Sequence, residues 1–257
     1  PLADGPVIQQ SSAIAIENGM TIAKLFEQLR GFRKEVSLPV ILMGYMNPVL
    51  QYGFEKFCAD ASAVGIDGLI LPDLPEFEFE TEYGTIVKKY NLNFIFLVTP
   101  ETSEERIKKL DSLTTGFLYA VSSSSTTGSD KINASPDAYL KKLKGLSLKN
   151  PVLVGFGIKD KASFDAVCQY AVGGIIGSAY IKALENSTDV NASTKSFLST
   201  IVGWMTWRFP IQWLNLQINS RITHLWKSDI TMKKLLLLLL LSPVFVLAQN
   251  AEKSFII

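Results

Sequence analysis

The feature that most constrains this sequence is an alternation between short apolar runs and longer amphipathic stretches, repeated over residues 1–202. The runs are continuously apolar and rich in β-branched and aromatic residues, which is typical of strands buried on both faces of a parallel sheet. There are six of them: Val40–Met43, Leu69–Leu71, Phe94–Val98, Phe117–Val121, Val152–Val154 and Gly174–Ile176. Strands that alternate with helices in this way predict a parallel α/β fold.

Helices are expected between these runs. Amphipathic spacing predicts them over Thr21–Lys34, Phe54–Val64 and Ser163–Tyr170. A further helix is expected to open at Thr102-Ser103-Glu104-Glu105, which has the pattern of a capping box.

Glycines follow the last two apolar runs, as Gly155-Phe156-Gly157 and as Gly177-Ser178. Glycine lets the backbone approach a phosphate closely, and the amides at a helix N-terminus can bind one without a cationic side chain. In (β/α)8 barrels the phosphate often lies between the loops after strands 7 and 8. We therefore expect an α/β (β/α)8 TIM barrel in which the six runs are strands 3 to 8, with strands 1 and 2 missing. The alternatives are an open doubly wound sheet and glycines that serve only tight turns.

Three other loops have two readings each. Ser122–Gly128 follows a predicted strand and is either a flexible linker or a lid over the substrate. Asp4 is either a turn residue bonded to its own backbone or a catalytic carboxylate. Asp73 lies between Pro72 and Pro75 and is read as part of a stiff strand exit, while Tyr45 either lines a pocket or packs.

The composition narrows the class of protein. A formal net charge of +1 provides no basic surface for nucleic acid. The two cysteines, Cys58 and Cys168, have no partner nearby in sequence and are expected to be reduced, which favours the cytoplasm. The single histidine, His224, lies beyond the repeats, so chemistry in the main body must use carboxylates, hydroxyls or backbone amides.

The C-terminal residues have a different character. Met232-Lys233-Lys234 is followed by an apolar stretch that begins with Leu235–Leu241, a pattern typical of a secretory signal and shorter than the roughly 20 residues that span a bilayer. We expect three parts: a partial barrel over 1–202, a translated spacer over 203–231, and a signal-like segment from a neighbouring gene over 232–257. A genuine membrane anchor is the alternative for this last segment.

Taken in order, six segments of the main body resemble the α subunits of tryptophan synthase. They are Pro1–Gln9, Met43–Pro48, Leu71–Pro75, Tyr119 with Ser122–Gly128, Gly155–Ile158, and Ile176–Ala179. The resemblance implies retro-aldol cleavage of indole-3-glycerol phosphate to indole and glyceraldehyde 3-phosphate. It also implies a pyridoxal phosphate-dependent β subunit as the partner in an α2β2 assembly, with no cofactor or metal in this subunit.

The resemblance also assigns site residues. Asp4 matches the Asp that bonds the indole N–H, Tyr119 matches a pocket tyrosine, and Thr127 matches a lid threonine that bonds that Asp. The phosphate-binding positions are Gly128, Gly157, Gly177 and Ser178, and the indole pocket is lined by Phe156, Met43 and Ile70. Asn47 belongs to the face that docks the β subunit.

Two departures from the family pattern matter. Ser123 and Ser125 replace an Arg and a Gly of the lid, and the acid–base Glu falls before Pro1, since Glu17 and Glu35 lie in helical contexts. The chain alone is therefore expected to have little activity and, with exposed strand edges, to be marginally folded or to aggregate. The alternatives are another phosphate-binding barrel enzyme of amino-acid biosynthesis, or a non-catalytic partner that activates the β subunit.

Overall fold

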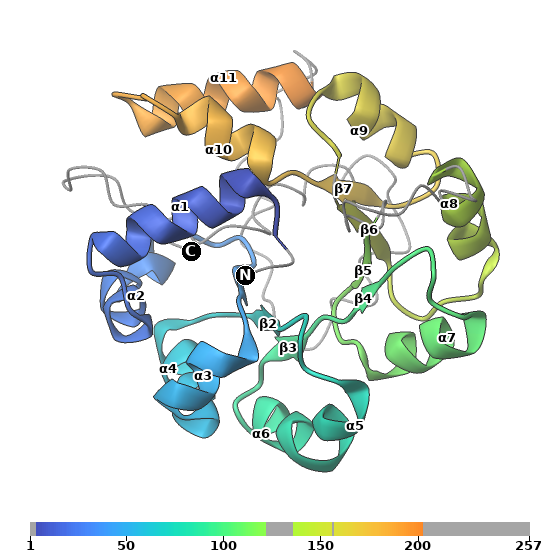
Figure 1. Cartoon of the computed structure of the whole chain (residues 1–257), viewed down its shortest axis with the longest axis horizontal. Helices are drawn as coiled ribbons and strands as arrows, with labels where there is room; N and C mark the ends of the chain where they lie inside the picture. The colour runs from blue at the N-terminus through green and yellow to red at the C-terminus, as the bar shows by residue number, and fades with distance from the viewer. Residues whose placement is uncertain (1–3, 122–135, 156, 203–257) are drawn as a thin grey trace.

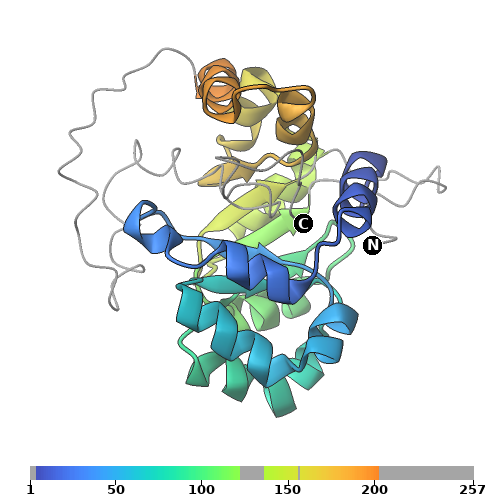
Figure 2. The same cartoon turned by 90° about the vertical axis from the view of Figure 1, so that its left-hand side faces the viewer.

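The computed structural model describes residues 4–121, 136–155 and 157–202 as an arc of parallel strands surrounded by helices (Figures 1 and 2). In both views α10 and α11 (orange) lie at the opposite end from α3 to α6 (cyan to teal). The strands are β1 (Ile41–Met43), β2 (Gly68–Ile70), β3 (Asn93–Phe94), β4 (Leu97–Val98), β5 (Leu118–Val121), β6 (Val152–Gly155) and β7 (Gly173–Ile175).

The helices follow or precede the strands in the order that a (β/α)8 barrel requires. They are α1 (Pro6–Glu17), α2 (Ile22–Gln28), η1 (Phe32–Lys34), α3 (Met46–Tyr52), α4 (Phe54–Val64), α5 (Glu76–Glu78), η2 (Phe79–Tyr83), α6 (Gly84–Lys89), α7 (Glu104–Leu113), α8 (Pro136–Gly145), α9 (Lys161–Val167), α10 (Ser178–Leu184) and α11 (Val190–Val202). Among the described residues, none of them is both long and apolar enough to cross a membrane.

The strands pair in sequence order and all in parallel, as β1-β2-β3 and β4-β5-β6-β7. All six apolar runs are therefore strands, but the run Phe94–Val98 is split into β3 and β4. Its backbone still joins both neighbours, because the Ile95 amide donates to the Leu69 carbonyl at 3.0 Å and the Phe96 carbonyl accepts from Tyr119 at 3.0 Å. The two short sheets are thus one continuous arc, in which β1 and β7 are the edges among the described strands.

The helix boundaries show where sequence spacing was too coarse. The helix expected over Thr21–Lys34 is broken at Gly31, whose φ of +80° is left-handed, into α2 and η1. The expected cap at Thr102 is wrong by one residue, since Ser103 caps α7 by accepting from the Arg106 amide at 3.3 Å. The capping box occurs instead at α9, where Asp160 and Ser163 bond reciprocally.

Alternate residues of each strand enter two different cores. Leu69, Phe94 and Leu118 pack with the surrounding helices, whereas Ile70 and Tyr119 belong to a second cluster on the other strand face. This alternation is the period of two that any strand imposes. It places the side chains expected to line the pocket together on the inner face of the arc.

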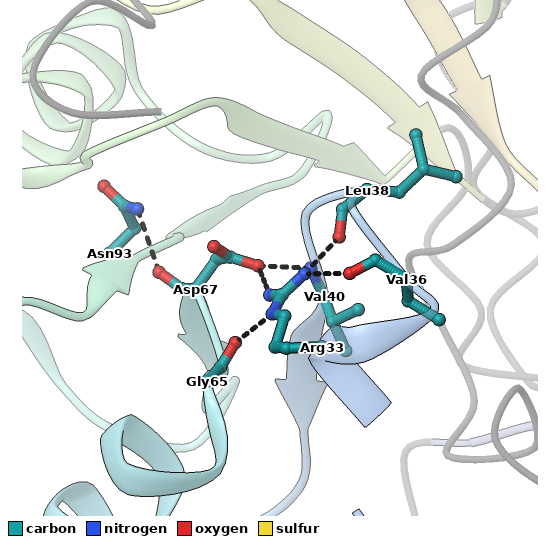
Figure 3. Close-up of polar contacts among 7 residues, drawn as sticks. All are labelled: Arg33, Val36, Leu38, Val40, Gly65, Asp67 and Asn93. Atoms are coloured by element: carbon teal, nitrogen blue, oxygen red, sulfur yellow. Dashed lines mark hydrogen bonds and ion pairs between the residues drawn. The ribbon is translucent and has the colours of Figure 1, made fainter. Parts of the chain in front are cut away.

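A polar network fixes the strands at their amino-terminal ends (Figure 3). The Arg33 guanidinium pairs with Asp67 and donates to the Gly65 carbonyl at 2.6 Å. The same carboxylate accepts from the Val40 amide at 2.6 Å, and the Asn93 side chain donates to the Asp67 carbonyl at 2.9 Å. The segments that enter β1, β2 and β3 are thereby tied to one another.

A second network does the same for β5 and β6. Asp111 is 5% exposed and accepts from the backbone amides of Lys149 at 2.6 Å and Asn150 at 3.0 Å. The Asn150 side chain donates to the Asp111 and Thr114 carbonyls at 2.6 and 3.0 Å. The end of α7 is therefore bonded to the segments that lead into both strands.

Candidate active site

The candidate site lies where the strands end, opposite the two polar networks. The loops after β1, β2, β6 and β7 all emerge on this face because the strands are parallel. Helix α1, which begins two residues after Asp4, contacts α10, the helix that follows β7 (Figure 1). In barrels of this kind this is the face that carries function.

Asp4 is held here by a tyrosine from another loop. The Tyr45 hydroxyl, just after β1, donates to Asp4 Oδ2 at 2.7 Å. The Gln9 side chain donates to the Asp4 carbonyl at 2.6 Å, which anchors the backbone to the first turns of α1. Burial raises the pKa of Tyr45, and the bond to Asp4 raises it further. Tyr45 is therefore a protonated donor at neutral pH, bonded to one of the two oxygens of the Asp4 carboxylate.

Tyr119 extends the site along the inner face of β5. Its side chain is 1% exposed, and its pKa is raised by burial and then by the negative charge of Asp4. Its ring lies over β6, where a Cβ added to Gly155 would overlap the Tyr119 hydroxyl. Glycine at this position is what allows the tyrosine to lie flat against the neighbouring strand.

Met43 and Ile70 form an apolar wall next to Tyr119. They are register partners in the β1–β2 pair, and both pack in the same inner cluster as Tyr119. Ile70 is 1% exposed and Met43 is half-buried. This arrangement suits a flat aromatic group rather than a charged one.

The glycines after β6 and β7 lie on adjacent strand ends, as expected. Gly155 pairs with Ile175, so the following residues Gly157 and Gly177 emerge from neighbouring strands. Gly157 has φ +77° and is exposed, and Gly177 caps α10. Ser178 is the first residue of that helix, where the amides have no acceptor within the helix. The arrangement can bind an anion through backbone amides.

Comparison with known proteins identifies the family. A family model described as tryptophan synthase alpha chain matches residues 1–206. The chain belongs to the tryptophan synthase alpha chain family. It is 49% identical over 190 residues to the protein of Bacteroides thetaiotaomicron, covering 74% of each chain, and 54% identical over 190 residues to that of Christiangramia forsetii, covering 73% of this chain and 74% of the relative.

Solved structures agree with this assignment. The chain resembles a mutant tryptophan synthase alpha-subunit from Pyrococcus furiosus with a TM-score of 0.70 and 33% identity, over 79% of this chain and 82% of the other. A second solved structure, of the tryptophan synthase A-subunit from the same organism, superposes on this chain with a TM-score of 0.68 at 32% identity and with the same coverage. The partial (β/α)8 barrel expected from the sequence is confirmed.

Some assignments of the tryptophan synthase family stay predictions. Thr127, Gly128 and Phe156 lie outside the described residues, as does the serine-rich segment Ser122–Ser125. The division of 203–257 into spacer and signal-like segment also falls outside the described part.

Sequence patterns did not predict two contacts in the site, one made by Tyr45 and one made by Asp73. Tyr45 had no assigned role, and its bond to Asp4 spans 41 residues. Asp73 does more than stiffen a strand exit, because both of its carboxylate oxygens accept from the Met46 amide, at 2.9 and 3.0 Å. One signal was present: Tyr45 precedes a helix and is not a capping residue type, so the helix needs a cap from elsewhere.

Proposed function

We propose that this chain binds indole-3-glycerol phosphate for retro-aldol cleavage to indole and glyceraldehyde 3-phosphate, a reaction that also needs the acid–base Glu of the family. Family membership gives the chain a lyase role in tryptophan biosynthesis. The observation that carries the substrate assignment is the Asp4 carboxylate, bonded to Tyr45, which follows Met43 of the apolar wall by two residues.

Asp4 is proposed to accept the indole N–H. In the reaction the acid–base Glu of the family adds a proton at C3 of the indole ring, and the ring nitrogen keeps its own proton and becomes positive. The glycerol hydroxyl then loses its proton, the C–C bond to C3 breaks, and its electron pair returns to the ring as the aldehyde leaves. A fixed carboxylate facing the N–H stabilises the state in which positive charge develops on nitrogen.

The other side chains are proposed to bind and orient. Met43, Ile70 and Tyr119 contact the indole ring, and Phe156 is assigned to the same pocket. The backbone amides of Gly157 and Gly177 and the Ser178 hydroxyl bind the phosphate, which is supported by their emergence from neighbouring strands. Gly128 is assigned to the same phosphate site, and Thr127 is assigned to the lid, where it would bond Asp4 on closure.

The partner is proposed from the family. Alpha chains imply a β subunit, and we propose an α2β2 assembly in which that subunit carries pyridoxal phosphate and this chain needs no cofactor. Asn47 and Leu50 are both exposed on α3 and Phe77 is exposed on α5; the apolar side chains of Leu50 and Phe77 are 48% and 69% exposed, which supports docking of a partner. The mass of the complex on size-exclusion chromatography with purified β subunit checks the assembly.

The proposed setting is the cytoplasm. Cys58 is a free thiol and is buried. Burial raises the pKa of the Cys58 thiol to about 12, so it stays protonated and unreactive at neutral pH. Cell fractionation followed by detection of the chain checks this proposal.

A binding experiment tests the role of Asp4. The probes are 3-(indol-3-yl)propyl phosphate, which lacks the reacting hydroxyls, and its 1-benzothiophene counterpart, which has sulfur in place of the N–H. A hydrogen bond to a charged group is worth about 1.5–3 kcal/mol, which is about 10- to 150-fold in affinity. We expect Asp4→Asn to weaken binding of the indole probe by at least about tenfold and to leave the benzothiophene probe unchanged.

Isothermal titration calorimetry measures both affinities. Ser103→Ala serves as the control, because it removes a helix cap in another loop of the same face. Equal losses for both probes in Asp4→Asn would contradict the assignment of Asp4 to the indole N–H.

A further inference from the structure

Helix α3 takes its N-terminal cap from a different loop. It begins at Met46, and its N-cap residue Tyr45 supplies no side-chain acceptor. Instead the Met46 amide donates to both oxygens of Asp73, at 2.9 and 3.0 Å, from 27 residues further along the chain. The loop after β1 is therefore fastened to the loop after β2.

The loop that carries Asp73 is itself held. Pro72 and Pro75 restrict the backbone near Asp73. The Leu74 amide donates to the Leu71 carbonyl at 3.1 Å, and the Leu74 side chain is 4% exposed. Asp73 thus projects from a tight turn that is anchored in the core, so its carboxylate is a fixed acceptor.

Tyr45 stands between this fixed acceptor and Asp4. Its backbone immediately precedes the amide that Asp73 holds, and its hydroxyl donates to Asp4 Oδ2 at 2.7 Å. The charges of Asp4 and Asp73 both raise the pKa of Tyr45, which means that both carboxylates act on the same hydroxyl. If the Met46 amide moves, Tyr45 moves with it, and the orientation of the Asp4 carboxylate that Tyr45 bonds changes as well.

We infer that Asp73 is a positioning residue: by holding the Met46 amide it sets Tyr45, and through Tyr45 it fixes one oxygen of Asp4 so that the other faces the ring N–H of an indole ligand. This inference rests on the proposed role of Asp4. Asp73 itself touches no reacting atom. The segment between Pro72 and Pro75 then positions a residue of the binding site, in addition to stiffening the exit of the strand.

The test uses the full chain and the two alkyl phosphate probes, indole and 1-benzothiophene. The quantity measured is the ratio of their affinities by calorimetry, which isolates the contribution of the N–H. We expect Asp73→Ala to lower this ratio about 3- to 10-fold, less than Asp4→Asn, because the Asp4 carboxylate is still present but is no longer held in one orientation. Asp73→Asn keeps one acceptor oxygen and should restore most of the ratio.

Ser103→Ala is the matched control, since Ser103 caps α7 by accepting from the Arg106 amide at 3.3 Å in a βα loop of the same face. The thermal unfolding midpoint of every variant is measured alongside. A lowered ratio in Asp73→Ala with an unchanged ratio in Ser103→Ala supports positioning.

The failures are distinguishable. If Asp73→Ala lowers the unfolding midpoint but leaves the ratio unchanged, while Asp4→Asn still lowers it, Asp73 is only a cap and the inference is overturned. If the unaltered chain shows no preference for the indole probe, or Asp4→Asn leaves that preference intact, the proposed function fails and the inference fails with it.

Discussion

The two ends of the strand arc are built differently. At the amino-terminal end, Asp67 and Asp111 are surrounded by donors from this chain: the Arg33 guanidinium and backbone amides. At the carboxyl-terminal end, Tyr45 is the one side-chain donor to the Asp4 carboxylate among the described residues, and the glycines after β6 and β7 present backbone amides. Carboxylates whose acceptor sites are used within the protein stabilise the fold, whereas those with capacity to spare can bind a ligand. The comparison predicts stability effects at one end and binding effects at the other.

The largest effect is expected at the amino-terminal end, from Asp111→Ala. This change leaves the Lys149 and Asn150 amides without their acceptor in a buried setting, which costs about 3 kcal/mol of unfolding free energy. Urea unfolding measures the loss, and the affinity for the indole probe should not change. Asp165→Ala is the control, because its pair with Lys161 is exposed and worth less than about 1 kcal/mol. If Asp111→Ala and Asp165→Ala lowered the unfolding free energy equally, the bonds of Asp111 would not be what stabilises the amino-terminal end.

Gly155→Ala is the expected exception at the carboxyl-terminal end, where close packing against Tyr119 should also give a stability effect. A Cβ here would overlap the Tyr119 hydroxyl, so the strands or the ring must shift, at a cost of about 1–3 kcal/mol. The cost should shrink by about 1 kcal/mol in a Tyr119→Leu background, where the overlapping atoms are absent. Urea unfolding of the four proteins in this cycle gives the coupling. Additive costs would show that the two residues do not meet.

Ser178→Ala should have the smallest effect on stability and act only on binding. Ser178 is exposed at the start of α10, so its removal should change the unfolding free energy by less than about 0.5 kcal/mol. Loss of one hydroxyl donor should weaken the indole alkyl phosphate about 3- to 10-fold, measured by calorimetry. Ser199→Ala is the matched control, since its hydroxyl bonds a carbonyl of its own helix. An unchanged affinity would exclude Ser178 from the phosphate site.

The sequence predicted the parts of the fold that depend on local patterns. Continuous apolar runs identified every strand, because a strand buried on both faces needs no partner to be recognised. The glycines after β6 and β7 located the candidate phosphate site for a similar reason, since each follows its own strand directly. Gly31, whose left-handed backbone separates α2 from η1, was visible but was read as part of a longer helix.

Contacts between distant segments could not be predicted in this way. The bonds of Tyr45 to Asp4 and of Met46 to Asp73 span 41 and 27 residues, and no spacing rule connects them. The split between β3 and β4 at Ile95 and Phe96 was also hidden, because both residues are as apolar and as buried as their neighbours. Each of these features depends on how two elements meet.

The contact between α1 and α10 has a consequence for the order in which the site is assembled during synthesis. Helix α1 begins at Pro6 and α10 at Ser178, a separation of 172 residues. At about 5–20 residues per second, α1 waits about 10–30 s after it is made before its partner helix is complete. The loop that carries Asp4 is therefore synthesised well before the segment that becomes its neighbour in the folded protein. A chaperone that holds the early helix would act during this interval.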